Sequence, residues 1–270
     1  MYNSLQLGYI LGSLGLTILI LILAGKLIKT SKNKNRFLLF WAWVTFLTHI
    51  SVMWVDYLAN GSAQAPDSVL FPIYFCNACM YTLMVVSLLP NKKGKLFYYL
   101  ATFVAYAGTF GALITLFESH YFADLTSAYT FGNFKSMLSH SFMLVGCLYL
   151  FVGKYVKIKV SNLIPYAYGL LGCFVLGNFI NWLFEANGLP NPNSMYLVKS
   201  ALDSVPLFTG YFLAAVMVVL ISLFTMIWEQ FAYKKGQRWY NSIATIFKNK
   251  TIVEKVGESV TEEVVEETQV

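Results

Sequence analysis

The feature that most constrains this chain is a series of seven apolar runs, separated by short polar segments. A transmembrane helix needs about 20 mostly apolar residues, and backbone groups in hydrocarbon must find their hydrogen bonds within the segment. The runs cover residues 8–27, 37–57, 69–89, 96–117, 137–153, 163–184 and 205–232. The sequence therefore predicts an all-α, polytopic membrane protein built as a bundle of seven transmembrane helices.

Composition excludes a soluble domain, because 57% of the 270 residues are hydrophobic and only 12% are charged, against about 25% in soluble proteins. The net charge of +6 does not indicate a nucleic-acid partner. The basic residues form short clusters between apolar runs rather than a stripe along one soluble face. We expect membrane phospholipids as partners and no nucleic acid, and no protein partner is assigned.

The basic clusters follow alternate runs and so predict the orientation. They are Lys26, Lys29, Lys32, Lys34 and Arg36, then Lys92, Lys93 and Lys95, then Lys154, Lys157 and Lys159, and finally Lys234, Lys235 and Arg238. The other connecting segments carry only Lys135 and Lys199. The positive-inside rule then places the N-terminus outside and the C-terminus in the cytoplasm. We expect a multi-pass protein of the plasma membrane.

Three regions are expected along the chain. Residues 1–233 form the transmembrane domain. Residues 234–250 combine a basic face with apolar residues at helical spacing, which is typical of an amphipathic helix on anionic lipid at the cytoplasmic face. Residues 251–270 hold six Glu and one Lys and are expected to be a disordered tail.

Polar side chains gather in the half of the bundle predicted to be outermost. They are His49, Cys76, Asn77, His140, Asn178, Asn181 and, just before the last run, Asp203. At a rise of about 1.5 Å per residue, most of them fall roughly 6 to 13 Å below the outer surface. Polar groups within a span are costly unless they face the bundle interior. The pattern favours a pocket open to the outer leaflet, and chance clustering near helix ends is the alternative.

Within this layer, Cys76 is the candidate nucleophile and His140 the candidate base, because a neutral imidazole can take a thiol proton and return it to a leaving group. Asn77, Asn178 and Asn181 are candidates to bind substrate or an oxyanion. The alternatives remain a buried cysteine that acts as a small apolar residue and a histidine that bonds to a neighbouring helix.

No metal site or cofactor is expected. Cys76 and Cys79 form a Cys-x-x-Cys pair, but no second ligand pair follows at zinc spacing, and a redox pair is the alternative. The last run, 205–232, contains no lysine for a retinal Schiff base, and the chain has no glycine-rich phosphate loop.

Three short segments carry a family resemblance. Residues 70–77, Leu-Phe-Pro-Ile-Tyr-Phe-Cys-Asn, resemble the Leu-Pro-x-His-x-Cys motif that opens helix 3 of YwaF-type integral membrane proteins, with Tyr74 where that motif usually has His. The Ser-His-Ser around His140 resembles a second marker of that family, and 178–182 resembles its Asn/Tyr segment. The family has seven predicted spans.

The YwaF-type family is similar to a eukaryotic transmembrane acyltransferase that moves fatty acyl chains among phospholipids with a Cys/His pair. The resemblance implies that Cys76 is the nucleophile and His140 the base. A thiol-dependent lipid acyltransferase or hydrolase is thus the first hypothesis. The alternative is a small-solute transporter or substrate-binding membrane subunit that uses His49, Asn178, Asn181 and Asp203. A third hypothesis is a scaffold or assembly factor that acts through the acidic tail and the basic interfacial helix.

Overall fold

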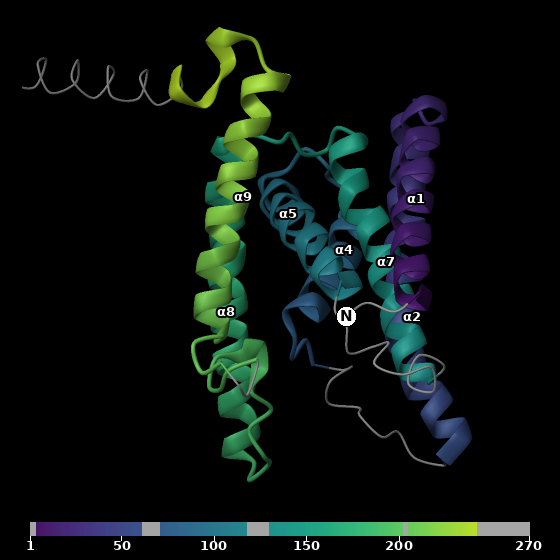
Figure 1. Ribbon diagram of the computed structural model, residues 1–270, viewed down its shortest axis with the longest axis vertical. Helices are drawn as coiled ribbons and strands as arrows, with labels where there is room; N and C mark the ends of the chain where they lie inside the picture. Colours follow the sequence, from purple (N-terminus) through teal and green to yellow (C-terminus); the bar gives the residue numbers. More distant parts are fainter. Residues whose placement is uncertain (1–3, 61–70, 118–129, 202–204, 242–270) are drawn as a thin grey trace, which may run out of the picture. The chain divides into compact units, whose positions relative to one another are not determined.

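The computed structural model describes residues 4–60, 71–117, 130–201 and 205–241, and all regular structure in these ranges is helical (Figure 1). The prediction of an all-α protein is confirmed for this part of the chain. The α-helices are α1 (Ser4–Leu27), α2 (Ser31–Asn60), α4 (Phe75–Leu88), α5 (Lys95–Phe117), α7 (Phe131–Val152), α8 (Leu163–Ala186) and α9 (Gly210–Ala232). Short 3-10 turns are η2 (Val160–Asn162), η3 (Ser194–Tyr196) and η4 (Lys235–Gln237).

Six described helices are long and apolar enough to cross a membrane, and α4 is the exception. The run expected at 69–89 becomes helical only at Phe75, because Pro72 lacks a backbone N–H and disfavours helix in the residue before it. The 14 residues of α4 rise about 21 Å, less than the roughly 30 Å hydrocarbon core. The multi-pass membrane fold is thus confirmed in its coarser form, with six candidate spans among the described residues, and the seventh span stays a prediction.

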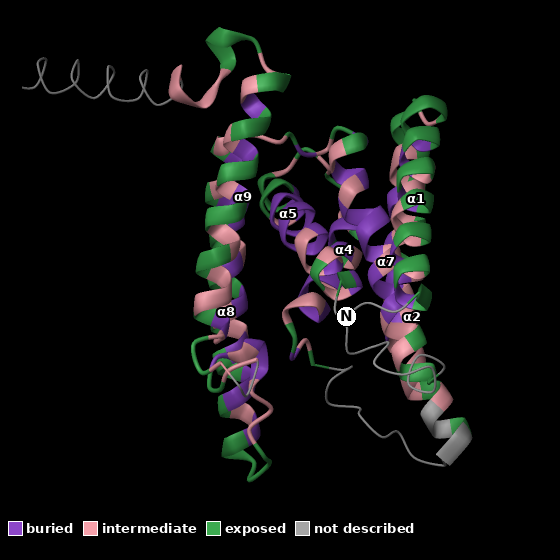
Figure 2. Cartoon of the chain, in the orientation of Figure 1, coloured by how far each residue is buried: buried purple, intermediate pink, exposed green. Residues whose placement is uncertain are grey.

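The chain divides into two compact units, and the larger comprises residues 1–157 and 162–219. In that unit α7 packs against α1, α2, α4 and α5, and α5 also packs against α8. Residues 101–109 of α5 are all buried, and Figure 2 shows buried residues concentrated on α5 and α7. These two helices form the centre of the larger unit.

Close packing around α7 depends on two glycines. A Cβ added at Gly108 of α5 would collide with the Cys147 sulfur on α7. A Cβ at Gly146 of α7 would lie 2.8 Å from the Leu83 side chain of α4. Small residues thus let α4, α5 and α7 approach closely, as is common between membrane helices.

The smaller unit comprises residues 158–161 and 220–270. Its buried Glu229 accepts a 2.6 Å hydrogen bond from the Val160 amide, and the Lys159 ammonium lies 4.8 Å from the Tyr233 ring centre. Burial, with a contribution from Glu229, raises the pKa of Tyr233. Most of the predicted amphipathic helix at 234–250, and the acidic tail at 251–270, lie outside the described residues.

Candidate functional site

Two helices bring together the two histidines of the predicted polar layer. His49 on α2 and His140 on α7 are only 5% and 4% exposed, and their side chains lie close enough to interact electrostatically. The His49 ring also meets the edge of Tyr81 on α4, with 6.2 Å between ring centres. Cys76 is the second residue of α4. The helix α4 packs against both α2 and α7.

His140 is held in one tautomer by its own helix. Its Nδ1 lies 2.7 Å from the Ser136 carbonyl oxygen, which can only accept, so Nδ1 donates. In the neutral ring, Nε2 then carries the lone pair. Nε2 is buried and has no hydrogen-bond partner among the described residues. This unpaired basic nitrogen is the atom that a general base requires.

Cys76 lies in the first turn of α4 and is partly exposed. Its thiol donates to the Asn77 side-chain oxygen over 3.7 Å. The positive end of a helix dipole favours a thiolate at such a position. The thiol is thus held by Asn77.

A lysine that sequence reasoning treated only as a loop residue belongs to this site. Lys135, in the second turn of α7, interacts electrostatically with Cys76, His49 and His140. A nearby cation favours a thiolate and stabilises a developing oxyanion. Spacing gave no signal for this, since residues five apart on a helix lie about 140° apart around its axis.

Asn181, a predicted substrate ligand, instead supports the segment that leads into α4. Its side-chain oxygen accepts a 2.7 Å bond from the Ser194 amide. The Ser194 hydroxyl and the Met195 amide in turn donate to the Ile73 carbonyl oxygen, at 3.0 and 2.7 Å. Asn181 thus acts on Cys76 through the backbone three residues before it.

Asn178 does not join the histidines either. It is exposed, and its amide donates to the Phe174 carbonyl at 2.9 Å and to the Tyr211 hydroxyl at 3.4 Å. Among the described residues neither Asn178 nor Asn181 hydrogen-bonds to His49, and the buried Asn181 Nδ2 has no partner there. Asp203 lies outside the described residues.

A comparison with protein-family models gives a match over nearly all of the apolar helices. The family model described as the TMEM164 family matches residues 2–228. The chain belongs to the TMEM164 family. This is a family of membrane proteins, in agreement with the apolar helices. No match to the chain was found among curated proteins or among solved structures.

The matched region of this TMEM164 family member contains every candidate site residue, including Asp203 and the additional Lys135. The likeness to YwaF-type proteins stays a prediction from the short motifs. The four cysteines are free thiols, so Cys76 and Cys79 are not paired with each other. No group of three potential metal-ligating side chains occurs within the described ranges.

Proposed function

We propose that this TMEM164 family member catalyses thiol-dependent transfer or hydrolysis of an acyl group on a membrane phospholipid. Cys76 is the nucleophile and His140 the base. The observation that carries the proposal is the buried, unpaired Nε2 of His140, whose lone pair is fixed by the Nδ1 bond to Ser136. The resemblance of residues 70–77 to a Cys motif associated with phospholipid acyl transfer adds to it.

The reaction has two halves. His140 Nε2 accepts the Cys76 proton, and the thiolate attacks the carbonyl carbon of a lipid ester. The carbon–oxygen bond breaks, His140 returns the proton to the departing alcohol, and the acyl group stays on sulfur as a thioester. A second alcohol, or water, then gives its proton to His140 and attacks the thioester, which restores the thiol and releases the new ester or the fatty acid.

The neighbouring side chains have separate tasks in this scheme. Asn77 holds the thiol at rest and donates its amide N–H to the oxyanion once the thiol has turned toward His140. The positive charge of Lys135 stabilises both the Cys76 thiolate and the oxyanion, because charges interact strongly in a poorly hydrated site. His49 contributes a second buried Nε2 without a partner among the described residues, which suits it to orient a hydroxyl of the incoming lipid.

The proposal includes an orientation of the protein in the membrane and a leaflet for the site. We infer from the lysine distribution that the N-terminus is outside, the C-terminus is cytoplasmic, and the protein spans the plasma membrane. The site then lies in the outer leaflet, and phospholipids enter it sideways between helices. The basic segment at 234–250 would rest on anionic lipid at the cytoplasmic face.

The test uses the purified full-length chain in phosphatidylcholine bilayers containing phospholipid with a labelled acyl chain. Cys76→Ala, Cys76→Ser and His140→Ala are compared with the unaltered chain for release or transfer of the label. Cys79→Ala is the matched control, since it deletes another thiol from the same helix, one turn away.

We expect the Cys76 and His140 variants to lose at least about a hundredfold in rate, since a positioned base alone is worth about 10²–10⁴. Cys79→Ala should retain activity. A labelled thioester trapped on the unaltered chain but not on Cys76→Ala would identify the intermediate. Equal lipid turnover in the Cys76→Ala, His140→Ala and control proteins would refute the proposal.

A further inference from the structure

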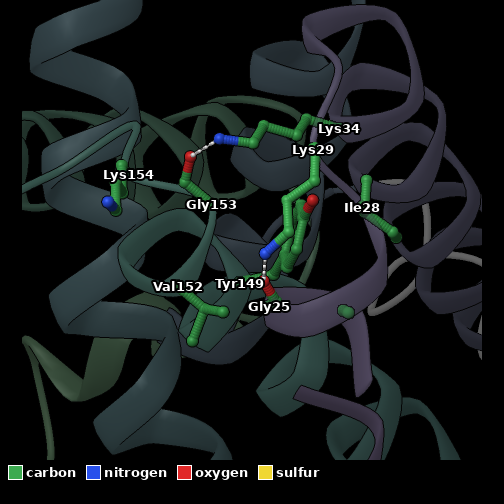
Figure 3. Close-up of a pocket in the computed structure, with 9 residues that line it drawn as sticks. Gly25, Ile28, Lys29, Lys34, Tyr149, Val152, Gly153 and Lys154 are labelled. Atoms are coloured by element: carbon green, nitrogen blue, oxygen red, sulfur yellow. Dashed lines mark hydrogen bonds between the residues drawn. The ribbon is translucent and has the colours of Figure 1, made fainter. Parts of the chain in front are cut away.

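A second polar site lies at the C-terminal end of α7, where lysines from two of the basic clusters lie close together. A cavity of about 110 Å³ opens between the end of α1, the start of α2 and the end of α7 (Figure 3). At about 30 Å³ per water molecule, it has room for three to four waters or one tetrahedral oxyanion. It is lined by Ala24, Gly25, Ile28, Lys29, Lys34, Tyr149, Val152, Gly153 and Lys154. Three of these residues are lysines and none is acidic.

Two of the lysines are fixed at the cavity by helix ends. Figure 3 shows Lys29 bonded back to the Gly25 carbonyl at 2.7 Å, and Lys34 reaching the Gly153 carbonyl at 3.2 Å. These carbonyls belong to the negative ends of α1 and α7, which alone would repel an anion. An ammonium group has three N–H donors, so each lysine keeps two for another acceptor after making its carbonyl bond. The two ammonium groups thus outweigh the partial negative charge of the helix ends, so that the cavity attracts an anion.

Tyr149 adds a buried donor to the same cavity. It is 1% exposed, its ring packs 4.4 Å from that of Phe37, and its hydroxyl has no hydrogen-bond partner within the described part of the chain. A buried hydroxyl without a partner is unfavourable, and such groups are uncommon in folded proteins. An acceptor in the cavity would satisfy it.

The third lysine is held in an unusual backbone conformation. Lys154 has φ of 65°, the left-handed region that normally favours glycine. Its amide donates to the Phe151 carbonyl and the Tyr155 amide to the Leu150 carbonyl, the paired bonds that close a helix with glycine at this position. Lysine carries a conformational cost at this position that glycine would not, and it adds a third charged residue to the lining of the cavity.

We infer that this cavity binds the phosphate group of an anionic ligand, with Lys29, Lys34, Lys154 and the Tyr149 hydroxyl as donors. A phosphate monoester carries a charge of about −1.5 to −2 near pH 7, which calls for more than one cation. Lysine binds phosphate as a compact point charge, and charged hydrogen bonds to it are strong. The headgroup of an anionic lipid and free inorganic phosphate share this chemistry. The site is separate from Cys76 and does not depend on the proposed acyl transfer.

The experiment measures ligand retention by native mass spectrometry on the full-length chain in detergent. The probes are short-chain phosphatidic acid, short-chain phosphatidylcholine and inorganic phosphate, each titrated alone and then in competition. Lys29→Gln with Lys154→Gln removes two cavity charges. Lys32→Gln with Lys93→Gln, two exposed lysines outside the lining, removes the same charge and is the matched control. Tyr149→Phe removes only the hydroxyl.

We expect phosphatidic acid to bind in preference to phosphatidylcholine, and the double cavity variant to weaken its Kd by about tenfold or more while the control pair stays near the original value. Tyr149→Phe should weaken binding and, without ligand, raise the unfolding temperature, since it deletes an unpaired buried group. This second readout excludes misfolding as the cause of lost binding.

Competition then identifies the source of the phosphate. Displacement of phosphatidic acid by inorganic phosphate would support a site for the phosphate group itself, and retention only of the lipid would support a headgroup site. Equal loss of binding in the cavity and control pairs would overturn the inference, because the attraction would then be one of net charge. Failure of all three probes to bind the unaltered chain would overturn it as well.

Discussion

The middle of α7 and its C-terminal end treat polar side chains in opposite ways. At His140 the buried nitrogens of two imidazoles are left without partners, and one tautomer is fixed by Ser136. Near Tyr149, nine residues and about 13 Å further along, two lysine ammonium groups are bonded to the carbonyls of helix ends. The first arrangement leaves an atom free to exchange a proton. The second fixes charge in place and suits binding rather than chemistry.

The largest effect expected from this comparison is at His140. His140→Leu fills a similar volume without the ring nitrogens, so it should abolish lipid turnover, a loss of at least about a hundredfold. It should leave the free energy of unfolding within about 1 kcal/mol, because the lost Nδ1 bond is offset by removal of an unpaired buried nitrogen. Thermal unfolding and turnover measured on the same sample test both parts. Strong destabilisation would mean that the ring is a packing element.

Asn181 on α8 combines both arrangements, because its side-chain oxygen accepts a bond from the Ser194 amide while its buried Nδ2 has no partner among the described residues. Asn181→Ala leaves the Ser194 amide without its acceptor and should destabilise the protein by about 1–3 kcal/mol. It should also slow turnover by loosening the Ile73 segment that leads to Cys76. Asn178→Ala, on the exposed side of the same helix, is the control. Equal effects of the two variants would contradict a positioning role for Asn181.

Lys34 tests the C-terminal end of α7. Lys34→Met keeps the length of the side chain but removes its bond to the Gly153 carbonyl, and should cost about 1–2 kcal/mol, since the negative end of α7 loses its neutralising charge. Lys32→Met, exposed on the first turn of the same helix, should cost far less. Unfolding midpoints in detergent compare the two variants. A cost that disappears at high salt would show that only exposed charge is involved.

Hydropathy predicted most of the fold, because a bilayer requires long apolar helices and those are visible in one sequence. Pro72 is a sequence signal for the late start of α4 at Phe75, because proline disfavours helix in the residue before it. Hydropathy alone did not show this start, because the residues on both sides of Pro72 are apolar. The exact number of full spans therefore could not be read from hydropathy.

Less of the two sites than of the fold could be predicted from the sequence. Depth along the helices placed His49, Cys76 and His140 in one layer, which stays a prediction for Cys76, although α2, α4 and α7 pack against one another. The partner of Asn181 could not be foreseen, because Ser194 lies on an irregular segment whose position depends on tertiary packing. From the sequence, the lysines of the cavity served only to predict the membrane topology. Their convergence on one cavity could not be predicted, because it depends on how α7 ends at Gly153 and Lys154.

Lys154 separates stability from binding. Lys154→Gly should raise the free energy of unfolding by about 0.5–1 kcal/mol, because glycine adopts φ of 65° without the steric cost that lysine bears. The same substitution removes one cavity cation and should weaken phosphate binding. A protein that is more stable and binds less would support a functional reason for the lysine. Unchanged binding with higher stability would mean that Lys154 is not part of the cavity's donor set.

A further effect concerns how stability depends on alkaline pH near the C-terminal end of α7. The Tyr155 hydroxyl donates to the Asn35 side-chain oxygen at 2.5 Å, and burial, with a contribution from Tyr149, raises the pKa of Tyr155. The folded state therefore keeps the phenol proton above about pH 10, where the unfolded chain releases it. Because the folded state then binds more protons, the free energy of unfolding falls as pH rises above about 10.

Tyr155→Phe should lower stability by about 1 kcal/mol at neutral pH, through loss of the bond to Asn35, and should make the loss of stability above about pH 10 less steep. Unfolding midpoints between about pH 8 and 11 measure both effects. Tyr168→Phe, an exposed tyrosine on α8, is the control and should leave the slope unchanged. If the two variants give the same slope, the alkaline sensitivity arises elsewhere, and polar pairing at this end of α7 contributes less to stability than the contrast with His140 implies.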